Sequence, residues 1–267
     1  MIEAVAFDLD DTLLRDDRTI SSYTIDVLRR AAAMGVKIIP ASGRARESMK
    51  PYVEQLGCAS AYIACNGAEV YAPDHQPLYA LQLSPEEARM AAQFAADHGC
   101  YAHVYAGDSF FYSMKGAYAE AYAQSSRLRG VYVGDLVQFI TTPTPKVLMM
   151  DDPARIARLL EEGRRLFGGR LALTCSKPHF LEVNPANASK GNALRWLGNH
   201  LGFSMEHAMA FGDSLNDLSM LTAAGYGVAM ANAREDVRAL IPAVCPSNQE
   251  DGVARYIEQH ILQEVHA

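Results

Sequence analysis

The sequence predicts an α/β protein, with a doubly wound parallel sheet that is interrupted by an inserted α+β domain. Near both ends of the chain, short apolar runs alternate with helical patterns, an order typical of a parallel sheet covered by helices. In the middle, helices stand beside alternating, aromatic-rich strands. We therefore expect a core made of residues 1–80 and 185–267, with an inserted cap of residues 81–184.

The first segment of the core starts with an unbroken apolar run at 4–7, as expected of a strand buried on both faces. Apolar residues recur at helical spacing from about residue 22 until Gly35, which is placed to end the helix. Residues 36–40 and 61–65 are two further candidate buried strands. Alternation of strand and helix predicts that all three strands join one sheet.

The middle of the chain changes to an α+β pattern. Its expected elements are a helix from a capping box at 84–87 to Gly99, strands at 101–105 and 109–113, a capped helix from 152, and a hairpin of 171–174 with 180–183.

The last segment returns to the strand and helix order of the first. Its expected elements are a helix capped by Ser189, a strand at 207–211, a helix from about 216 to Gly225, a strand at 226–230, a helix at 233–241 and an amphipathic tail at 257–266.

Composition excludes several classes of protein. The chain has 267 residues, 49% of them hydrophobic, with 24 basic and 31 acidic side chains and a net charge of −7. A negative balance argues against a nucleic-acid binder, and no apolar run approaches the ~18 residues of a membrane span. Five scattered cysteines without a CxxC pair fit a reducing compartment. We expect a cytoplasmic monomer or homodimer.

The strongest chemical signal is the run of carboxylates that follows the first strand. Asp8, Asp10 and Asp11 stand where an open α/β sheet binds ligands, beyond the carboxyl end of a strand. Carboxylates crowded there repel one another unless a cation joins them, and Mg²⁺ prefers such oxygen ligands. Alternation along the loop points Asp8 and Asp10 to the same side. The alternative is a solvated acidic turn.

A second acidic loop follows the strand predicted at 207–211. Gly212 allows a sharp turn, and Asp213 stands at the strand tip, where it could share a cation with Asp8. Taken alone, this loop is better explained as a helix start with favourable acids. Two acidic loops at strand ends of one sheet together favour a Mg²⁺ site.

Phosphate-binding groups are expected on the same edge. Ser42 and Gly43 follow the second strand, and Lys190 opens a helix after Ser189. A hydroxyl, an unhindered backbone N–H and a lysine all donate to phosphate oxygens, although each alone is more often a turn or a solvated side chain. The sequence lacks GxxxxGK[ST], GxSxG and HExxH, which argues against a P-loop enzyme, a serine hydrolase and a zinc protease.

Together these residues resemble the four motifs of haloacid dehalogenase (HAD) superfamily phosphatases, over the whole chain. The motifs are Asp8-Leu9-Asp10-x-Thr12, Ser42-Gly43, Lys190 and Gly212-Asp213-x-x-Asn216-Asp217. The position of the insertion is similar to that of the Cof-like branch, subclass IIB. Asp11 departs from the pattern, because the family often has glycine there.

The resemblance implies a Mg²⁺-dependent phosphatase that hydrolyses small phosphorylated metabolites, such as sugar phosphates, through an aspartyl-phosphate. The residues and roles that it implies are Asp8 as nucleophile, Asp10 as acid and base, Asp8, the Asp10 carbonyl and Asp213 as metal ligands, Leu9, Ser42, Gly43, Lys190 and Asn216 as phosphate ligands, Thr12 as the support of Asp10, Asp217 as a support of the metal site, and Arg44 and Asn66 as substrate contacts.

Two other functions stay open at this stage: a phosphomutase with the same chemistry, and a non-catalytic protein that binds a phosphorylated metabolite. The predicted cap is expected to close over the site, and its polar aromatic residues are candidates to recognise a sugar. The alternative is that most of them only pack its sheet. They are His103, Tyr105, Tyr112, Tyr118 and Tyr122, with Lys115 and Arg127 nearby in sequence.

Overall fold

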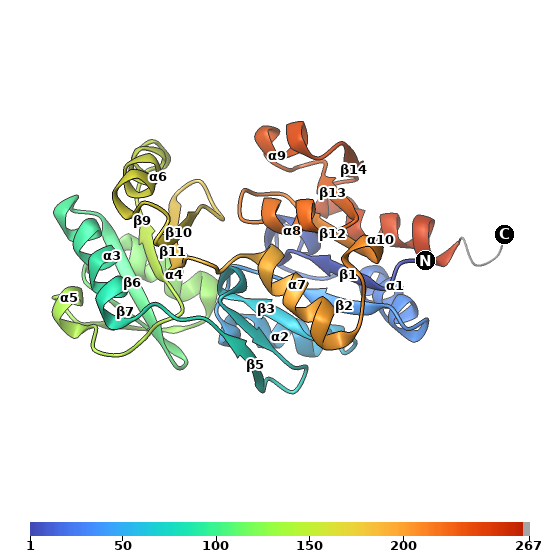
Figure 1. Cartoon of the computed structure of the whole chain (residues 1–267), viewed down its shortest axis with the longest axis horizontal. Helices are drawn as coiled ribbons and strands as arrows, with labels where there is room; N and C mark the ends of the chain where they lie inside the picture. The colour runs from blue at the N-terminus through green and yellow to red at the C-terminus, as the bar shows by residue number, and fades with distance from the viewer. Residues whose placement is uncertain (264–267) are drawn as a thin grey trace.

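The computed structural model describes residues 1–263 and confirms the α/β class. It contains a five-stranded parallel sheet, a six-stranded mixed sheet and a small three-stranded antiparallel sheet. In Figure 1 the six-stranded sheet and its helices lie on the left, and the parallel sheet with both chain ends lies on the right. The connections between the two bodies are short stretches of chain near the middle of the view.

The parallel sheet is the structural base of the predicted core. Its strands, in spatial order, are β14 (Ala243–Cys245), β13 (Tyr226–Met230), β12 (Ala208–Gly212), β1 (Ala4–Phe7) and β2 (Lys37–Pro40). All neighbouring pairs run parallel, so every strand ends at the same edge. The chain segments that follow β1, β2 and β12 are therefore brought together there.

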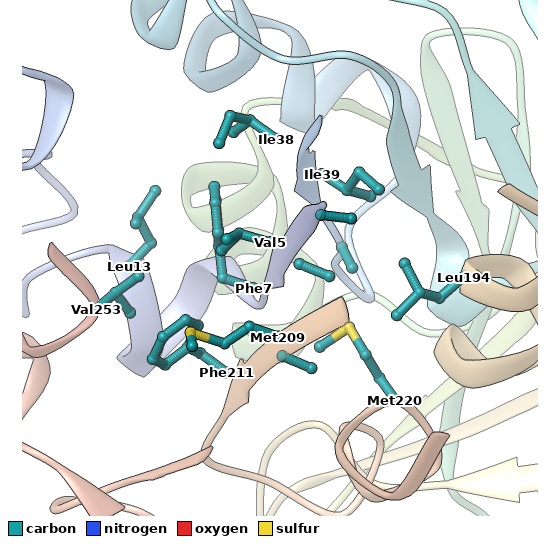
Figure 2. Packing of buried hydrophobic residues seen from close by; sticks show 14 of the residues in the cluster. Val5, Phe7, Leu13, Ile38, Ile39, Leu194, Met209, Phe211, Met220 and Val253 are labelled. Carbon is teal, nitrogen blue, oxygen red and sulfur yellow. The ribbon is translucent and has the colours of Figure 1, made fainter. Parts of the chain in front are cut away.

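Helices cover this sheet on both faces, as expected for a doubly wound fold. They are α1 (Ser22–Ala33), α2 (Arg46–Leu56), α7 (Lys190–Leu201), α8 (Leu218–Ala223), α9 (Glu235–Leu240) and α10 (Gly252–Ile257), with short helical turns at η1 (Leu9–Leu13), η3 (Met205–His207), η4 (Asn248–Glu250) and η5 (Glu258–Leu262). Figure 2 shows Leu194 and Met220 on one side of the strands and Leu13 and Val253 on the other.

One predicted strand lies in a different sheet from the one expected. β3 (Tyr62–Ala64) pairs antiparallel with β4 (Glu69–Tyr71), which pairs with β5 (Pro77–Ala80). It meets the parallel sheet only through isolated bridges, of Ala41 with Ile63 and of Ile38 with Ala59. The apolar run indicated burial correctly, but burial on two faces does not reveal which strand lies alongside.

The second body is an antiparallel sheet with one parallel edge pair and helices packed on it. Its strands, in spatial order, are β10 (Leu171–Thr174), β11 (Phe180–Pro185), β9 (Val147–Met150), β6 (Tyr101–Ala106), β7 (Ser109–Tyr112) and β8 (Arg129–Tyr132), and its helices are α3 (Pro85–Asp97), α4 (Ala117–Ser126), α5 (Leu136–Phe139) and α6 (Pro153–Phe167). The predicted α3, β6, β7, α6, β10 and β11 are confirmed. The central strand β9 was not predicted, although its buried apolar run VLMM is the same kind of signal that predicts the strand at 4–7.

Two further findings concern membranes and the tail. No helix within residues 1–263 is long and apolar enough to cross a membrane. The helix predicted at 257–266 is present as far as Leu262, in η5, and residues 264–267 lie outside the described part of the chain.

Close packing of α7 on α8 places the start of α7 at the sheet edge. A Cβ atom added at Gly191 would collide with the backbone carbonyl of Ser219, at the second residue of α8. Backbone cannot move aside as a flexible side chain can, so only glycine fits here. The same packing holds the neighbouring Lys190 in a fully buried position.

We therefore expect Gly191→Ala to lower the free energy of unfolding by about 1–3 kcal/mol, the usual cost of overpacking. Thermal and urea denaturation measure this change. Gly163→Ala in α6 is a matched control, because its new Cβ would meet the movable side chain of Leu173 and alanine favours a helix. Equal effects of the two substitutions would contradict the argument.

Candidate active site

Three buried carboxylates gather where β1 and β12 end. Asp8 follows β1, Asp213 follows β12, and Asp217 stands at the start of α8, and oxygens of all three lie within 4.8 Å of one another. The adjacent strands β1 and β12 are in register at Phe7 and Phe211, which brings the two loops together. Gly212 allows the close approach, because a Cβ there would collide with the side chain of Asp217.

Lys190, the first residue of α7, is the cation among these carboxylates. Its Nζ donates to Asp8 Oδ1 and, at 2.6 Å, to Asp217 Oδ1. The other oxygen of Asp217 accepts the backbone N–H groups of Asp213 and Ser214, each at 3.0 Å. Asp217 therefore ties α7 to the loop after β12.

One ammonium cannot neutralise three buried carboxylates. Burial, with Asp217 and Asp10 nearby, raises the pKa of Asp8 to about 8 in spite of Lys190. Burial and the charges of Asp217 and Asp8 also raise the pKa of Asp213 well above its ordinary value. Burial opposes the charge on Lys190, but Asp217 and Asp8 raise its pKa. Excess negative charge on hard oxygen atoms is what a divalent cation such as Mg²⁺ requires, so these residues fit one.

Thr12 has a different partner from the one expected. Its hydroxyl donates to Asp213 Oδ1 at 2.8 Å, so the expectation that it orients Asp10 is wrong. Both loops leave the same sheet edge, which brings the Thr12 hydroxyl within reach of the loop after β12. Asp11, the departure from the family pattern, is exposed and adopts a φ of 59°, a conformation that glycine takes without strain.

Asp10 is held by Arg44 rather than by Thr12. Arg44 donates to its two carboxylate oxygens from Nε at 2.7 Å and from Nη2 at 2.8 Å, and Lys177 Nζ lies 3.8 Å away. Although burial favours the neutral form, Arg44 lowers the pKa of Asp10. The guanidinium of Arg44 is engaged with Asp10, and the residue also lines the pocket, so its expected contact with substrate stays a prediction.

The expected phosphate ligands lie around the same edge. Ser42 is buried and its Oγ accepts the backbone N–H of Arg44 at 3.2 Å, while Leu9 begins η1 directly after Asp8. Asn216 donates through Nδ2 to Asn66 Oδ1 at 3.0 Å. The phosphate role of Asn216 stays a prediction, and the side-chain atom that this bond leaves free is its oxygen.

A pocket of about 590 Å³, a volume that includes its open mouth, collects most of these residues. From the predicted site it is lined by Asp8, Asp10, Ser42, Gly43, Arg44, Asp213 and Asn216. Lys190, Asp217 and Thr12 are buried beneath it. Asn66 lines a neighbouring pocket together with Asn216.

The second body supplies the opposite wall of this pocket. Tyr122, Lys146, Lys177, Phe180 and Glu182 line it, and among the polar aromatic residues proposed for recognition only Tyr122 does so. His103 and Tyr105 are buried instead, in a hydrogen-bonded chain that ends on the Tyr122 hydroxyl. Sequence reasoning missed Lys146, Lys177 and Glu182, since a single charged residue within or beside a strand gives no sign of the wall that it will face.

A sequence model described as haloacid dehalogenase-like hydrolase matches residues 5–257. The chain belongs to this family. It is 31% identical to an HMP-PP phosphatase of Serratia proteamaculans over 98% of this chain and 96% of that one. It is 30% identical to a 5-amino-6-(5-phospho-D-ribitylamino)uracil phosphatase of Bacillus subtilis, over 98% and 96% of the two chains.

Solved structures share the whole fold. A haloacid dehalogenase-like hydrolase from Bacteroides thetaiotaomicron has a TM-score of 0.84 and 28% identity, over 97% of this chain and 99% of that one. The resemblance to Cof-like subclass IIB phosphatases is confirmed, and the enzyme class, a HAD-type phosphatase, is confirmed with it.

The raised pKa of Asp8 predicts how stability depends on pH. In EDTA, the unfolded chain loses this proton near pH 4 and the folded protein holds it to about pH 8, so unfolding releases a proton between these values. Stability should therefore fall as pH rises through this window, by up to roughly 1.4 kcal/mol per unit. Thermal scans should show that slope, a flatter one in Asp8→Asn, and a Mg²⁺ stabilisation that is larger at pH 8 than at pH 5.

An unchanged slope in Asp8→Asn would contradict this assignment. Asp74→Asn, an exposed carboxylate outside the site, serves as the control and should keep the slope of the unmodified protein.

Proposed function

We propose that this member of the HAD family is a Mg²⁺-dependent phosphatase that hydrolyses small phosphorylated metabolites of the cytoplasm through an aspartyl-phosphate on Asp8. The observation that carries the proposal is the placement of Asp8. Asp8 lines the same pocket as Asp10, contacts Lys190, and lies beside two further carboxylates. The relatives named above act on phosphorylated compounds, one of them a phosphoribityl compound, which supports a sugar-like leaving group.

The nucleophile in the first step is the Asp8 carboxylate. It attacks phosphorus in line, and the bond from phosphorus to the ester oxygen breaks, so that one difficult step becomes two easier ones. Asp8, the Asp10 carbonyl and Asp213 would hold Mg²⁺, which when bound supplies positive charge to the phosphoryl oxygens. Lys190 contacts the Asp8 carboxylate and favours its charged form, and a bound divalent cation would add to this effect.

Asp10 moves the protons. As an acid it gives a proton to the departing ester oxygen, and as a base it then takes one from the water that attacks the phosphorus of the aspartyl-phosphate. This second attack releases inorganic phosphate and restores the Asp8 carboxylate. Arg44 fixes the position of both Asp10 oxygens for these transfers.

Backbone and hydroxyl donors hold the transferring group. We assign this task to the N–H groups of Leu9 and Gly43, the Ser42 hydroxyl and Lys190, with Asn216 at the pocket wall. Fixed donors aimed at developing charge in a site shielded from water stabilise the transition state without reorganisation. Residues 81–184 act as the cap, and their side chains close the pocket from the far side.

The central prediction concerns Asp8→Asn. Loss of the nucleophile should abolish phosphate release from sugar phosphates, nucleotides and an aryl phosphate, and EDTA should have the same effect on the unmodified enzyme. Asp11→Asn is the matched control, because Asp11 is the exposed neighbour whose positive φ suits asparagine. Normal turnover by Asp8→Asn would refute the proposal.

The predicted role of Asp10 separates two kinds of substrate. Asp10→Asn should lower kcat/KM for alkyl phosphates by about 100-fold or more, because an alkoxide leaves poorly without an acid. A nitrophenolate leaves without help, so p-nitrophenyl phosphate should instead give a rapid burst of one equivalent and then slow turnover, which stopped-flow absorbance detects. Equal losses on both substrates, with no burst, would mean that Asp10 has another task.

A further inference from the structure

Two buried side-chain oxygens in the described part of the chain have no hydrogen-bond partner, and both belong to residues that line the active-site pocket. They are Glu182 Oε2 and Asn216 Oδ1, and the two residues are 1% and 7% exposed. A buried polar atom without a partner is costly, and native proteins leave few of them. Both atoms are acceptors, so whatever completes this pocket must bring hydrogen-bond donors.

Glu182 is held by a lysine that leaves one of its oxygens free. Lys146 Nζ donates to Glu182 Oε1 and to the backbone carbonyl of Gly43, each at 2.6 Å, and lies 5.2 Å from the centre of the Tyr105 ring. These contacts satisfy the ammonium, and Glu182 raises the pKa of Lys146 although burial opposes its charge. The pair is therefore charged and fixed, with Oε2 as its unused atom.

The Glu182 carboxylate lies against the loop that we assign to the phosphoryl group, through the oxygen that Lys146 binds. A Cβ placed on Gly43 would be 3.2 Å from Glu182 Oε1 and 2.9 Å from Asn66 Oδ1. Glu182 therefore lies against the glycine whose N–H we assign to the phosphoryl group. Both residues line the same pocket, so the Glu182 carboxylate lies beside the space that the first atoms of a leaving group would occupy.

The orientation of Asn216 follows from a chain of amides. Asn184 Nδ2 donates to the carbonyl of Cys65 at 3.1 Å, so its oxygen is available to accept from Asn66 Nδ2, at 3.4 Å. Asn66 Oδ1 then accepts from Asn216 Nδ2. Carbonyl oxygens only accept, so the direction of the chain is fixed, and it leaves Asn216 with its oxygen unpaired.

We propose that Glu182, held by Lys146, is a specificity-determining residue that accepts a hydrogen bond from a hydroxyl or amino group near the ester oxygen of the leaving group. Asn216 Oδ1 offers a second acceptor on the opposite wall. The preferred substrates are then phosphate esters of polyols or amino alcohols rather than of plain alkyl or aryl groups. This proposal rests on the phosphatase function proposed above.

A purely structural task for the pair is the competing explanation. A buried ion pair that joins the cap to the Gly43 carbonyl would close the two bodies on each other, and its loss would affect every substrate alike. If Glu182 recognises the substrate, kcat/KM should fall more for substrates that carry a hydroxyl or amino donor than for those that do not. The two explanations differ in the ratio between matched substrates, which a structural defect does not change.

The test compares two matched pairs of substrates: glycerol 3-phosphate with n-propyl phosphate, and 2-aminoethyl phosphate with ethyl phosphate. Each pair shares its carbon chain and differs in donors. The first variant combines Lys146→Met with Glu182→Leu, which removes both charges and keeps an apolar filling, so that no charge is left buried alone. The second, Glu182→Gln, keeps the shape and replaces the carboxylate by a neutral amide. Thermal denaturation checks that both fold.

In the unmodified enzyme, kcat/KM should favour the donor-bearing member of at least one pair. The double variant should reduce this preference by about 10- to 100-fold, the value of a hydrogen bond to a charged acceptor. Glu182→Gln should reduce the preference most in the 2-aminoethyl pair. A hydroxyl can accept a hydrogen bond from the glutamine NH₂ group, whereas an ammonium group can only donate. Which pair responds distinguishes a hydroxyl from an amino substrate.

Equal losses of kcat/KM for the two members of each pair would show that the ion pair only joins the two bodies, and would overturn the proposal. An unchanged preference would overturn it as well. If the unmodified enzyme releases no phosphate from any of these esters or from p-nitrophenyl phosphate, the phosphatase function itself has failed. In that case calorimetric binding of the same four compounds still tests the subsite. A folded double variant that keeps the binding preference would then overturn it.

Discussion

The arrangement of the core depends on one buried ammonium among three buried carboxylates. Lys190 contacts Asp8 and Asp217 directly, and Asp213 completes the group. Charges taken out of water are costly unless they are paired, so the loops after β1 and β12 and the start of α7 have to meet at one place. Even so, the lysine neutralises only part of the negative charge. The residues that hold these segments together therefore also leave an excess of negative charge, which a divalent cation could neutralise.

Close backbone packing makes this arrangement possible, and it requires glycine at several positions. Gly191 lets α7 approach the backbone of α8 closely enough to bury the neighbouring lysine, and Gly212 gives Asp217 room beside the turn after β12. Gly43 is the third such position, because a Cβ added there would meet the side chains of Asn66 and Glu182. Each glycine stands beside a residue to which we assign a role in catalysis or binding. The same glycines are therefore required both for close packing of the backbone and for the placement of the site residues.

The core side of the site could be predicted from sequence, and the cap side could not. In a parallel sheet, a residue that directly follows a strand is placed by the strand, which is why Asp8, Ser42 and Asp213 were assigned before their geometry was known. The strand does not determine which group a long side chain contacts. The contact of Arg44 with Asp10 was therefore not predicted. Lys146 and Glu182 come from neighbouring antiparallel strands whose register depends on the unpredicted β9. Their contacts with Gly43 join residues far apart in the sequence, and no local sequence pattern indicates them.

In the free enzyme Arg44 holds the pKa of Asp10 below its usual range, whereas the general acid that we propose has to carry a proton. The phosphoryl group of a substrate changes this balance, because it brings negative charge into the pocket that Asp10 and Arg44 share. Nearby negative charge raises the pKa of a carboxyl group, and phosphoryl oxygens compete with Asp10 for the guanidinium and for Lys177. In the mechanism proposed above, Asp10 thus takes up the proton that it later gives to the leaving group only when an ester is bound. Without one, it stays charged, paired with Arg44 and in place.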